Sequence, residues 1–145
     1  MSNALEEGLE LELDFTKLAG VAATGQPVIP VVLQHADTGD VLLVGYVNDE
    51  ALRVSLAEGI AVLWSTSRNE LWRKGATSGD VLSLVDVRVN CEQNSVLYRV
   101  RPVNAGVCHT RSASGDTRAT CYYRIIDRII DDAAADQLRF ADDLN

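Results

Sequence analysis

Three cysteines and one histidine within a short stretch constrain this chain more than any other feature. Cys91, Cys108 and Cys121 are its only cysteines, and His109 directly follows the second. Three thiolates with one coordination position left open are typical of a zinc ion that takes part in chemistry, because a structural zinc usually has four protein ligands. Beside such a ligand, His109 is a candidate general acid or base. The spacing between successive cysteines does not form a CxxC motif, which is the usual sign of a zinc site. The alternative interpretation is therefore that the cysteines are small buried apolar residues.

Composition restricts the partners and the setting of such a site. The chain has 13 basic and 21 acidic residues and a net charge of −8, which argues against nucleic acids or anionic membranes as partners. No apolar run approaches the length of a membrane-spanning helix, and the acidic N-terminus lacks the pattern of a signal peptide. An odd number of cysteines then favours a reduced, cytoplasmic setting in which thiols are available for metal.

The hydrophobic pattern predicts a single α+β domain over residues 1–145, with an antiparallel, barrel-like sheet core and short helices. Strands are expected at 28–33, 41–47, 61–64, 81–89 and 96–103. Asn48 and Gly59 are expected to cap the two ends of one helix. Residues 1–12 are expected to form a flexible arm, and apolar spacing over 127–141 predicts a C-terminal helix.

Two of these strands carry more specific expectations. Pro30 has no backbone N–H to donate, so it is expected to place the first strand at a sheet edge or a bulge. In the strand 81–89, the valines at 81, 85, 87 and 89 are expected to share one face, with Asp86 and Arg88 on the other.

A polar loop at 65–79 follows the third strand and concentrates positive charge in an acidic protein. The candidate substrate- or phosphate-binding residues are Trp64, Ser65, Arg68, Arg73, Lys74, Thr77 and Ser78. Guanidinium, ammonium and hydroxyl groups suit phosphate oxygens, and Trp64 or Trp72 can stack on a base. The alternative is a solvated loop with the tryptophans packed beneath it.

The residues around the first cysteine suggest a second, weaker metal site. In an extended segment, Asn90, Glu92 and Asn94 project to one face while Cys91 projects to the other. Three oxygen-bearing side chains are candidate ligands for Mg²⁺, although only one of them is a carboxylate. The alternative is the polar end of a strand.

Taken together, three blocks of the sequence resemble the phosphoribosyl-AMP cyclohydrolases of histidine biosynthesis. They are TGDVLLVGYVNDEAL at 38–52, WSTSRNELWRKGATSG at 64–79, and Cys108-His109-Thr110 followed by Cys121-Tyr122-Tyr123. The resemblance runs from about residue 13 to residue 124, and the middle block is characteristic of the family.

The resemblance implies a zinc-dependent cyclic amidine hydrolase that cleaves the N1–C6 bond of the adenine ring of 1-(5-phosphoribosyl)-AMP. It also implies an intertwined homodimer with one zinc ion per subunit, held by Cys91 of one chain and by Cys108 and Cys121 of the other. His109 would then be the catalytic residue that shuttles the proton, and the loop 64–79 would bind a phosphate of the substrate.

Two features depart from the family pattern. The family carries Asp-Cys-Asp-x-Asp where this chain has Asn90, Glu92 and Asn94 around Cys91, so Mg²⁺ is expected to bind weakly or not at all. The segment 111–120 is about six residues longer than usual, and it is expected to be a flexible excursion that leaves both flanking ligands in place.

Two other functions stay open on the sequence alone. A paralogue could open another purine or cyclic amidine nucleotide, for which the altered residues around Cys91 are the only support. A non-catalytic, zinc-bearing nucleotide-binding module has no need of His109 or of an open ligand position. The HxE and PCxxC signatures of nucleobase deaminases do not occur in the sequence, which excludes that class.

Overall fold

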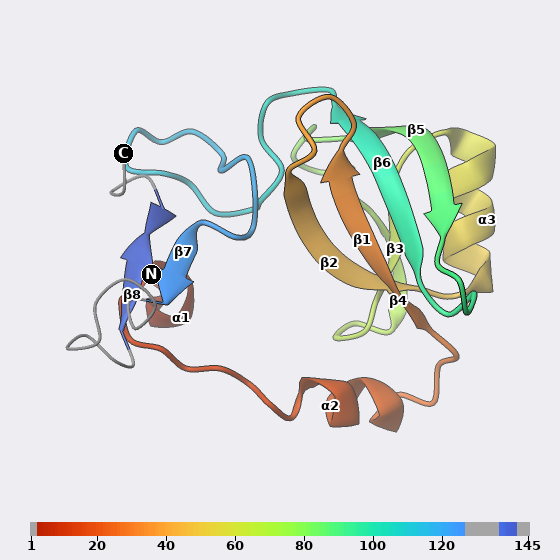
Figure 1. Cartoon of the computed structure of the whole chain (residues 1–145), viewed down its shortest axis with the longest axis horizontal. Coiled ribbons are helices and arrows are strands. Elements are labelled where there is room, and N and C mark those ends of the chain that lie inside the picture. The colour runs from red at the N-terminus through yellow and green to blue at the C-terminus, as the bar shows by residue number, and fades with distance from the viewer. Residues whose placement is uncertain (1–2, 127–136, 142–145) are drawn as a thin grey trace. The chain divides into compact units, whose positions relative to one another are not determined.

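The computed structural model describes residues 3–126 and 137–141 of the chain. The chain divides into two compact units, of which the larger is Lys17–Cys121 and the smaller combines Met1–Thr16 with Tyr122–Asn145. Figure 1 shows the elements of both units. The three cysteines, His109 and the polar loop all lie in the larger unit.

A four-stranded sheet with the order β2-β1-β6-β5 is the framework of the larger unit (Figure 1). Its strands are β1 (Ile29–His35), β2 (Val41–Val47), β5 (Leu82–Val89) and β6 (Val96–Pro102). Neighbours pair antiparallel except β1 and β6, which are parallel. Because β2 and β5 are the two edge strands and do not pair with each other, the sheet is open: the α+β class is confirmed, and the barrel-like closure is wrong.

A second, two-stranded sheet carries the start of the polar loop. It consists of β3 (Val62–Ser65) and β4 (Glu70–Arg73), which pair antiparallel. The prediction of a continuous loop at 65–79 is therefore wrong for residues 70–73, which form β4. Asn69 adopts a left-handed φ of 56°, which reverses the chain between the two strands and returns it along β3.

The helix between β2 and β3 has the predicted ends. In α3 (Asp49–Glu58) the side chain of Asn48 accepts a hydrogen bond of 2.8 Å from the N–H of Ala51, and Gly59 takes the left-handed φ of 71° that ends the helix. A shorter helix, α2 (Lys17–Ala23), precedes β1. Among the helices of the described residues, none has both the length and the apolar character needed to cross a membrane.

Two details of the sheet correct the sequence predictions. Pro30 lies in β1, an interior strand, and is tolerated there because the pairing of β1 with β6 begins only at Val31. In β5 the register shifts between Leu84 and Asp86, so Val85 is an extra residue of a bulge. The alternation breaks at that point: Leu82 is buried in the core while Val85 and Val89 are exposed.

The smaller unit brings the two chain ends together. It contains α1 (Ala4–Glu7) and an antiparallel pair, β7 (Arg124–Ile126) with β8 (Leu138–Phe140). The hydroxyl of Tyr123 donates a 2.7 Å hydrogen bond to the carbonyl of Glu6, so the predicted arm has both a helical turn and a partner. Of the predicted C-terminal helix, 127–136 lie outside the described residues, and 138–140 form a strand instead.

Candidate active site

Cys108 and Cys121 lie near each other, and the Cys121 thiol is the main influence on the pKa of Cys108. The backbone holds each of them in place. The N–H of Cys108 donates to the carbonyl of Arg118 at 2.9 Å, and the N–H of Cys121 donates to the carbonyl of Leu42, at the start of β2, at 2.8 Å. The hydroxyl of Thr110 lies 3.1 Å from the Cys108 sulfur. These bonds fix two sulfur atoms at one end of the sheet.

The proximity of the two thiols shifts their pKa values in opposite directions. The hydrogen bond from Cys121 lowers the pKa of Cys108 to about 5, helped by Thr110 and by the charge of His109. The pKa of Cys121 is raised, because the neighbouring sulfur and burial both disfavour its anion. At neutral pH the pair therefore holds one thiolate and one thiol. A soft cation that displaced the remaining proton would find two sulfur ligands already in place.

Cys91 does not join this pair within one chain. It occupies the exposed turn between β5 and β6, at the end of the sheet where β6 begins. Leu42, which anchors Cys121, belongs to the opposite end, where β1 finishes. The register places Leu42 level with Arg99 of β6 and two strands away from it, which is already about 10 Å across the sheet, whereas two sulfur ligands of one zinc ion lie roughly 4 Å apart. In the described part of the chain, no three His, Cys, Asp or Glu side chains are placed to share a metal.

The three residues considered for Mg²⁺ form a closed turn instead of an extended face. The Asn90 side-chain oxygen accepts from the N–H groups of Asn94 and Ser95, both at 2.9 Å. Its amide donates to the side-chain oxygen of Asn94 at 2.6 Å. Gln93 adopts a left-handed φ of 55°, so the predicted alternation of faces is wrong. Two of the three candidate ligand oxygens are thus used within the turn, and the arrangement does not fit a cation.

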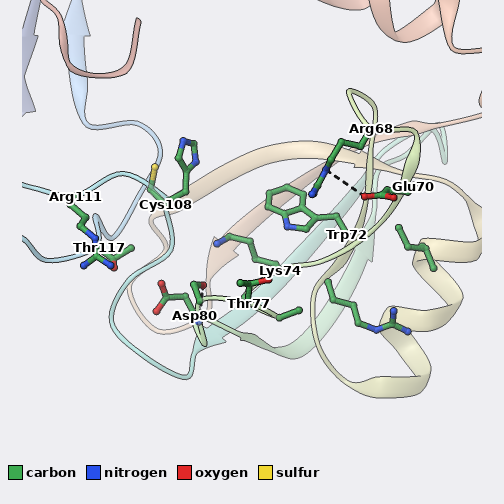
Figure 2. A pocket seen from close by; sticks show the side chains of 15 residues that line it. Arg68, Glu70, Trp72, Lys74, Thr77, Asp80, Cys108, Arg111 and Thr117 are labelled. Atoms are coloured by element: carbon green, nitrogen blue, oxygen red, sulfur yellow. Dashed lines mark hydrogen bonds and ion pairs between the residues drawn. The ribbon is translucent and has the colours of Figure 1, made fainter. Parts of the chain in front are cut away.

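A cavity of about 440 Å³ opens beside the thiol pair, and most of the polar loop lines it. Figure 2 shows Lys74 and Trp72 on its wall together with Cys108. Of the seven candidates from the sequence, five line it: Arg68, Arg73, Lys74, Thr77 and Ser78. His109 lines it as well.

Trp64 and Ser65 are not among the lining residues, because their side chains serve the hairpin. The indole N–H of Trp64 lies 3.3 Å from the Asn69 side-chain oxygen, and the Ser65 hydroxyl accepts from the N–H of Arg68 at 3.2 Å. Trp72 is the tryptophan that reaches the cavity. Glu70, Asp80, Arg111 and Thr117 also line it and were missed from the sequence.

The cationic side chains around the cavity differ in whether they already form an ion pair with a carboxylate. Arg68 is 3.6 Å from Glu70, and Arg73 holds Glu58 with two hydrogen bonds of 3.2 Å. Lys74 is only 6% exposed, and its ammonium group lies 5.9 Å from the centre of the Trp72 ring. No carboxylate of the described residues pairs with Lys74, so its charge is available to an anion in the cavity.

Cys108 and His109 lie at the wall of a cavity that four cationic side chains also line, an arrangement typical of an enzyme's active site. A family model described as phosphoribosyl-AMP cyclohydrolase matches residues 43–123, which include all three cysteines and His109. The chain belongs to the phosphoribosyl-AMP cyclohydrolase family, and the resemblance noted in the sequence is confirmed.

Relatives that bear that name match over most of their length. A protein of Caulobacter vibrioides (strain NA1000 / CB15N) is 40% identical over 119 residues, which are 81% of this chain and 80% of the relative. One from Bradyrhizobium diazoefficiens is 40% identical over 126 residues, 87% of this chain and 79% of the relative. One from Caulobacter sp. (strain K31) is 42% identical over 99 residues, 68% and 69% of the two chains.

Proposed function

We propose that this chain hydrolyses the N1–C6 bond of the adenine ring of 1-(5-phosphoribosyl)-AMP, the cyclic amidine hydrolysis that the family name describes, in histidine biosynthesis. The observation that carries the proposal is that one cavity is lined by His109, by Cys108 and by the buried cation Lys74. A proton carrier, a metal-binding sulfur and an anion-binding group therefore face the same space.

The proposed cofactor is one zinc ion per subunit, held by Cys108 and Cys121 of one chain and by Cys91 of a second copy in a homodimer. The lowered pKa of Cys108 and its adjacent thiol supply two soft ligands, which suit zinc. Within the described residues no third candidate ligand joins the two cysteines, and Cys91 of the same chain lies in the turn that precedes β6, which favours a third ligand from another subunit. When bound, zinc supplies an activated water as the nucleophile.

The substrate's own chemistry determines what the remaining groups must do. Alkylation at N1 leaves the adenine ring cationic, so C6 is electrophilic. Water adds at C6, the C6–N1 bond breaks as the new C6 hydroxyl releases its proton to solvent and becomes a carboxamide carbonyl, and the departing nitrogen needs a proton. We assign that transfer to His109, which takes the proton from the attacking water and returns it to N1. Trp72 offers a face for the ring, and Lys74, Arg68, Thr77 and Ser78 offer donors for a phosphate.

Magnesium has no role in this proposal. The turn made by Asn90 and Asn94 already uses two of the three side-chain groups that would coordinate it. Weak or absent Mg²⁺ binding therefore remains our expectation for this chain.

Ring opening of phosphoribosyl-AMP, followed by absorbance with zinc-loaded protein, tests the proposal. The His109→Ala variant should keep its zinc and lose about 100- to 10,000-fold in kcat. His35→Ala is the matched control, because His35 is the other histidine and does not line this cavity. Inactive wild type would overturn the proposal, and opening of a different purine nucleotide would assign the paralogue. A normal rate in His109→Ala would remove that residue from the mechanism.

A further inference from the structure

The long segment between the last two cysteines is a small hydrogen-bonded hairpin, more structured than the flexible excursion predicted from the sequence. Arg111 and Thr117 form an antiparallel bridge at its base. Near the tip, the N–H of Ser112 donates to the carbonyl of Asp116 at 2.8 Å, and the N–H of Gly115 donates to the carbonyl of Ser112 at 2.9 Å. Residues 111–117 are called the insertion hairpin below.

The insertion hairpin is attached to the segment that carries the thiol pair. The carbonyl of Arg118 accepts hydrogen bonds from the N–H groups of Val107 and Cys108, both at 2.9 Å, and the N–H of Arg118 donates to the carbonyl of Thr110 at 3.1 Å. Gly106 packs so closely on Thr117 that a Cβ at position 106 would collide with it. The base of the hairpin therefore has a fixed position relative to Cys108.

Two side chains of the insertion hairpin, Arg111 and Thr117, form part of the cavity wall. Figure 2 shows them on the side of the cavity away from Arg68, with Lys74 between. One guanidinium nitrogen of Arg111 donates to the carbonyl of Gly115 at 2.9 Å, which orients the group. Within the described residues Arg111 has no ion pair with a carboxylate. Most of its five N–H donors remain available to an anion.

The substrate of the proposed reaction carries two phosphates, one on each ribose, at opposite ends of the molecule. The loop that contains Lys74 can neutralise one of them. A second anionic group across the cavity needs a cation of its own, because leaving a dianion unpaired in a partly enclosed site is costly. Arg111 is the cation on that wall, and its planar fork matches phosphate oxygens.

We propose that Arg111 binds the second phosphate of a doubly phosphorylated nucleotide, and that the insertion hairpin is a specificity element for such substrates. The proposal rests on the proposed function for the identity of the substrate. Thr117 adds a hydroxyl donor on the same wall. Arg111 acts in binding and does not touch the reacting bond, so its removal affects KM and leaves kcat nearly unchanged.

Steady-state kinetics on phosphoribosyl-AMP with the zinc-loaded full chain test this role. Arg111→Gln should raise KM about 10- to 100-fold, as expected for the loss of a charge-assisted contact, with kcat within about threefold. Arg111→Lys, which keeps the charge without the fork, should lie between wild type and Arg111→Gln. Arg53→Gln controls for loss of one positive charge, because Arg53 is exposed on α3 and does not line the cavity.

A further variant separates binding from hairpin integrity. Among the described residues, the Ser114 hydroxyl bonds only within the tip, to Ser112 at 2.8 Å and to Asp116 at 3.1 Å, so Ser114→Ala should leave KM unchanged. A KM for Arg111→Gln no higher than that of Arg53→Gln would overturn the role of Arg111. An equal rise in KM for Ser114→Ala would overturn it too, because hairpin integrity would then be the cause. Inactive wild type would instead refute the proposed function.

Discussion

Replacing Ser55 by alanine should remove a buried connection between α3 and the two sheets. Ser55 is fully buried in α3, and its hydroxyl accepts hydrogen bonds from the N–H of Val62 in β3 at 2.9 Å and from the hydroxyl of Tyr98 in β6 at 3.2 Å. It also lies 2.9 Å from two backbone carbonyls, those of Ala51 and Val62. One hydroxyl thus joins the helix to both sheets.

The magnitude follows from the groups that the substitution leaves without a partner. The N–H of Val62 and the hydroxyl of Tyr98 are both buried, and an unsatisfied buried donor costs about 1–3 kcal/mol. Taking about 1–2 kcal/mol for each of these two donors, Ser55→Ala should lower the free energy of unfolding by about 2–4 kcal/mol. For a chain of 145 residues this corresponds to a fall in Tm of roughly 6–12 °C. Tyr98→Phe removes only one of the bonds and should cost about 1 kcal/mol.

Thermal unfolding followed by circular dichroism, at one protein concentration and with zinc present, measures these differences. Ser83→Ala makes the same chemical change at an exposed position of β5 and should shift the Tm by less than about 2 °C. A fall in Tm for Ser55→Ala no larger than that of Ser83→Ala would show that the hydroxyl is not a structural junction, and the reasoning would be refuted.

Three further outcomes are expected. In metal-free protein, thiolate absorbance should show one group titrating near pH 5, and Cys121→Ala should move it upward because the thiol that lowers the pKa of Cys108 is gone. Ionisation of Cys108 stabilises the folded state fully at pH values above the pKa of an ordinary thiol, and this stabilisation is lost as the pH falls through about 5. The raised pKa of Cys121 makes the opposite contribution to folding stability. Calorimetric titration should detect no tight Mg²⁺ site in wild type; a saturable site that Glu92→Ala abolishes would contradict this. Cys121→Ser should lose zinc and weaken any dimer together, as metal analysis and sedimentation can show.

The sequence predicts local structure well where one short pattern determines the outcome. Val41–Val47 is the predicted strand, and Asn48 and Gly59 cap the predicted helix. The cysteines and His109 could be singled out as candidate site residues, because cysteine and histidine are rare in this chain. Long-range pairing was not predictable. The parallel contact of β1 with β6 joins residues about sixty positions apart and puts Pro30 in an interior strand.

Irregularities of the backbone explain the remaining differences. The bulge at Val85 inserts one residue into β5 and reverses which side chains face the core beyond it, which no alternating pattern can indicate. The insertion hairpin joins Arg111 to Thr117 across a turn at Gly115. The glycine is visible in the sequence, but the serine-rich composition around it suggested a flexible segment instead of a hairpin. Whether the sulfurs of one chain meet depends on the order and register of the strands that carry them, which are properties of the fold.

Cys91 lies at one end of the sheet, and Cys108 and Cys121 lie at the other. A substitution at Cys91 and a substitution at Cys108 can therefore be placed on different chains of one dimer. Under the proposed sharing, a Cys91→Ser chain and a Cys108→Ser chain are each inactive alone. In a mixed pair, both defects fall on the same metal position, and the other position receives three intact sulfurs. The two inactive variants, refolded together, should therefore form mixed dimers with one intact zinc site each, and part of the lost zinc content and turnover should return.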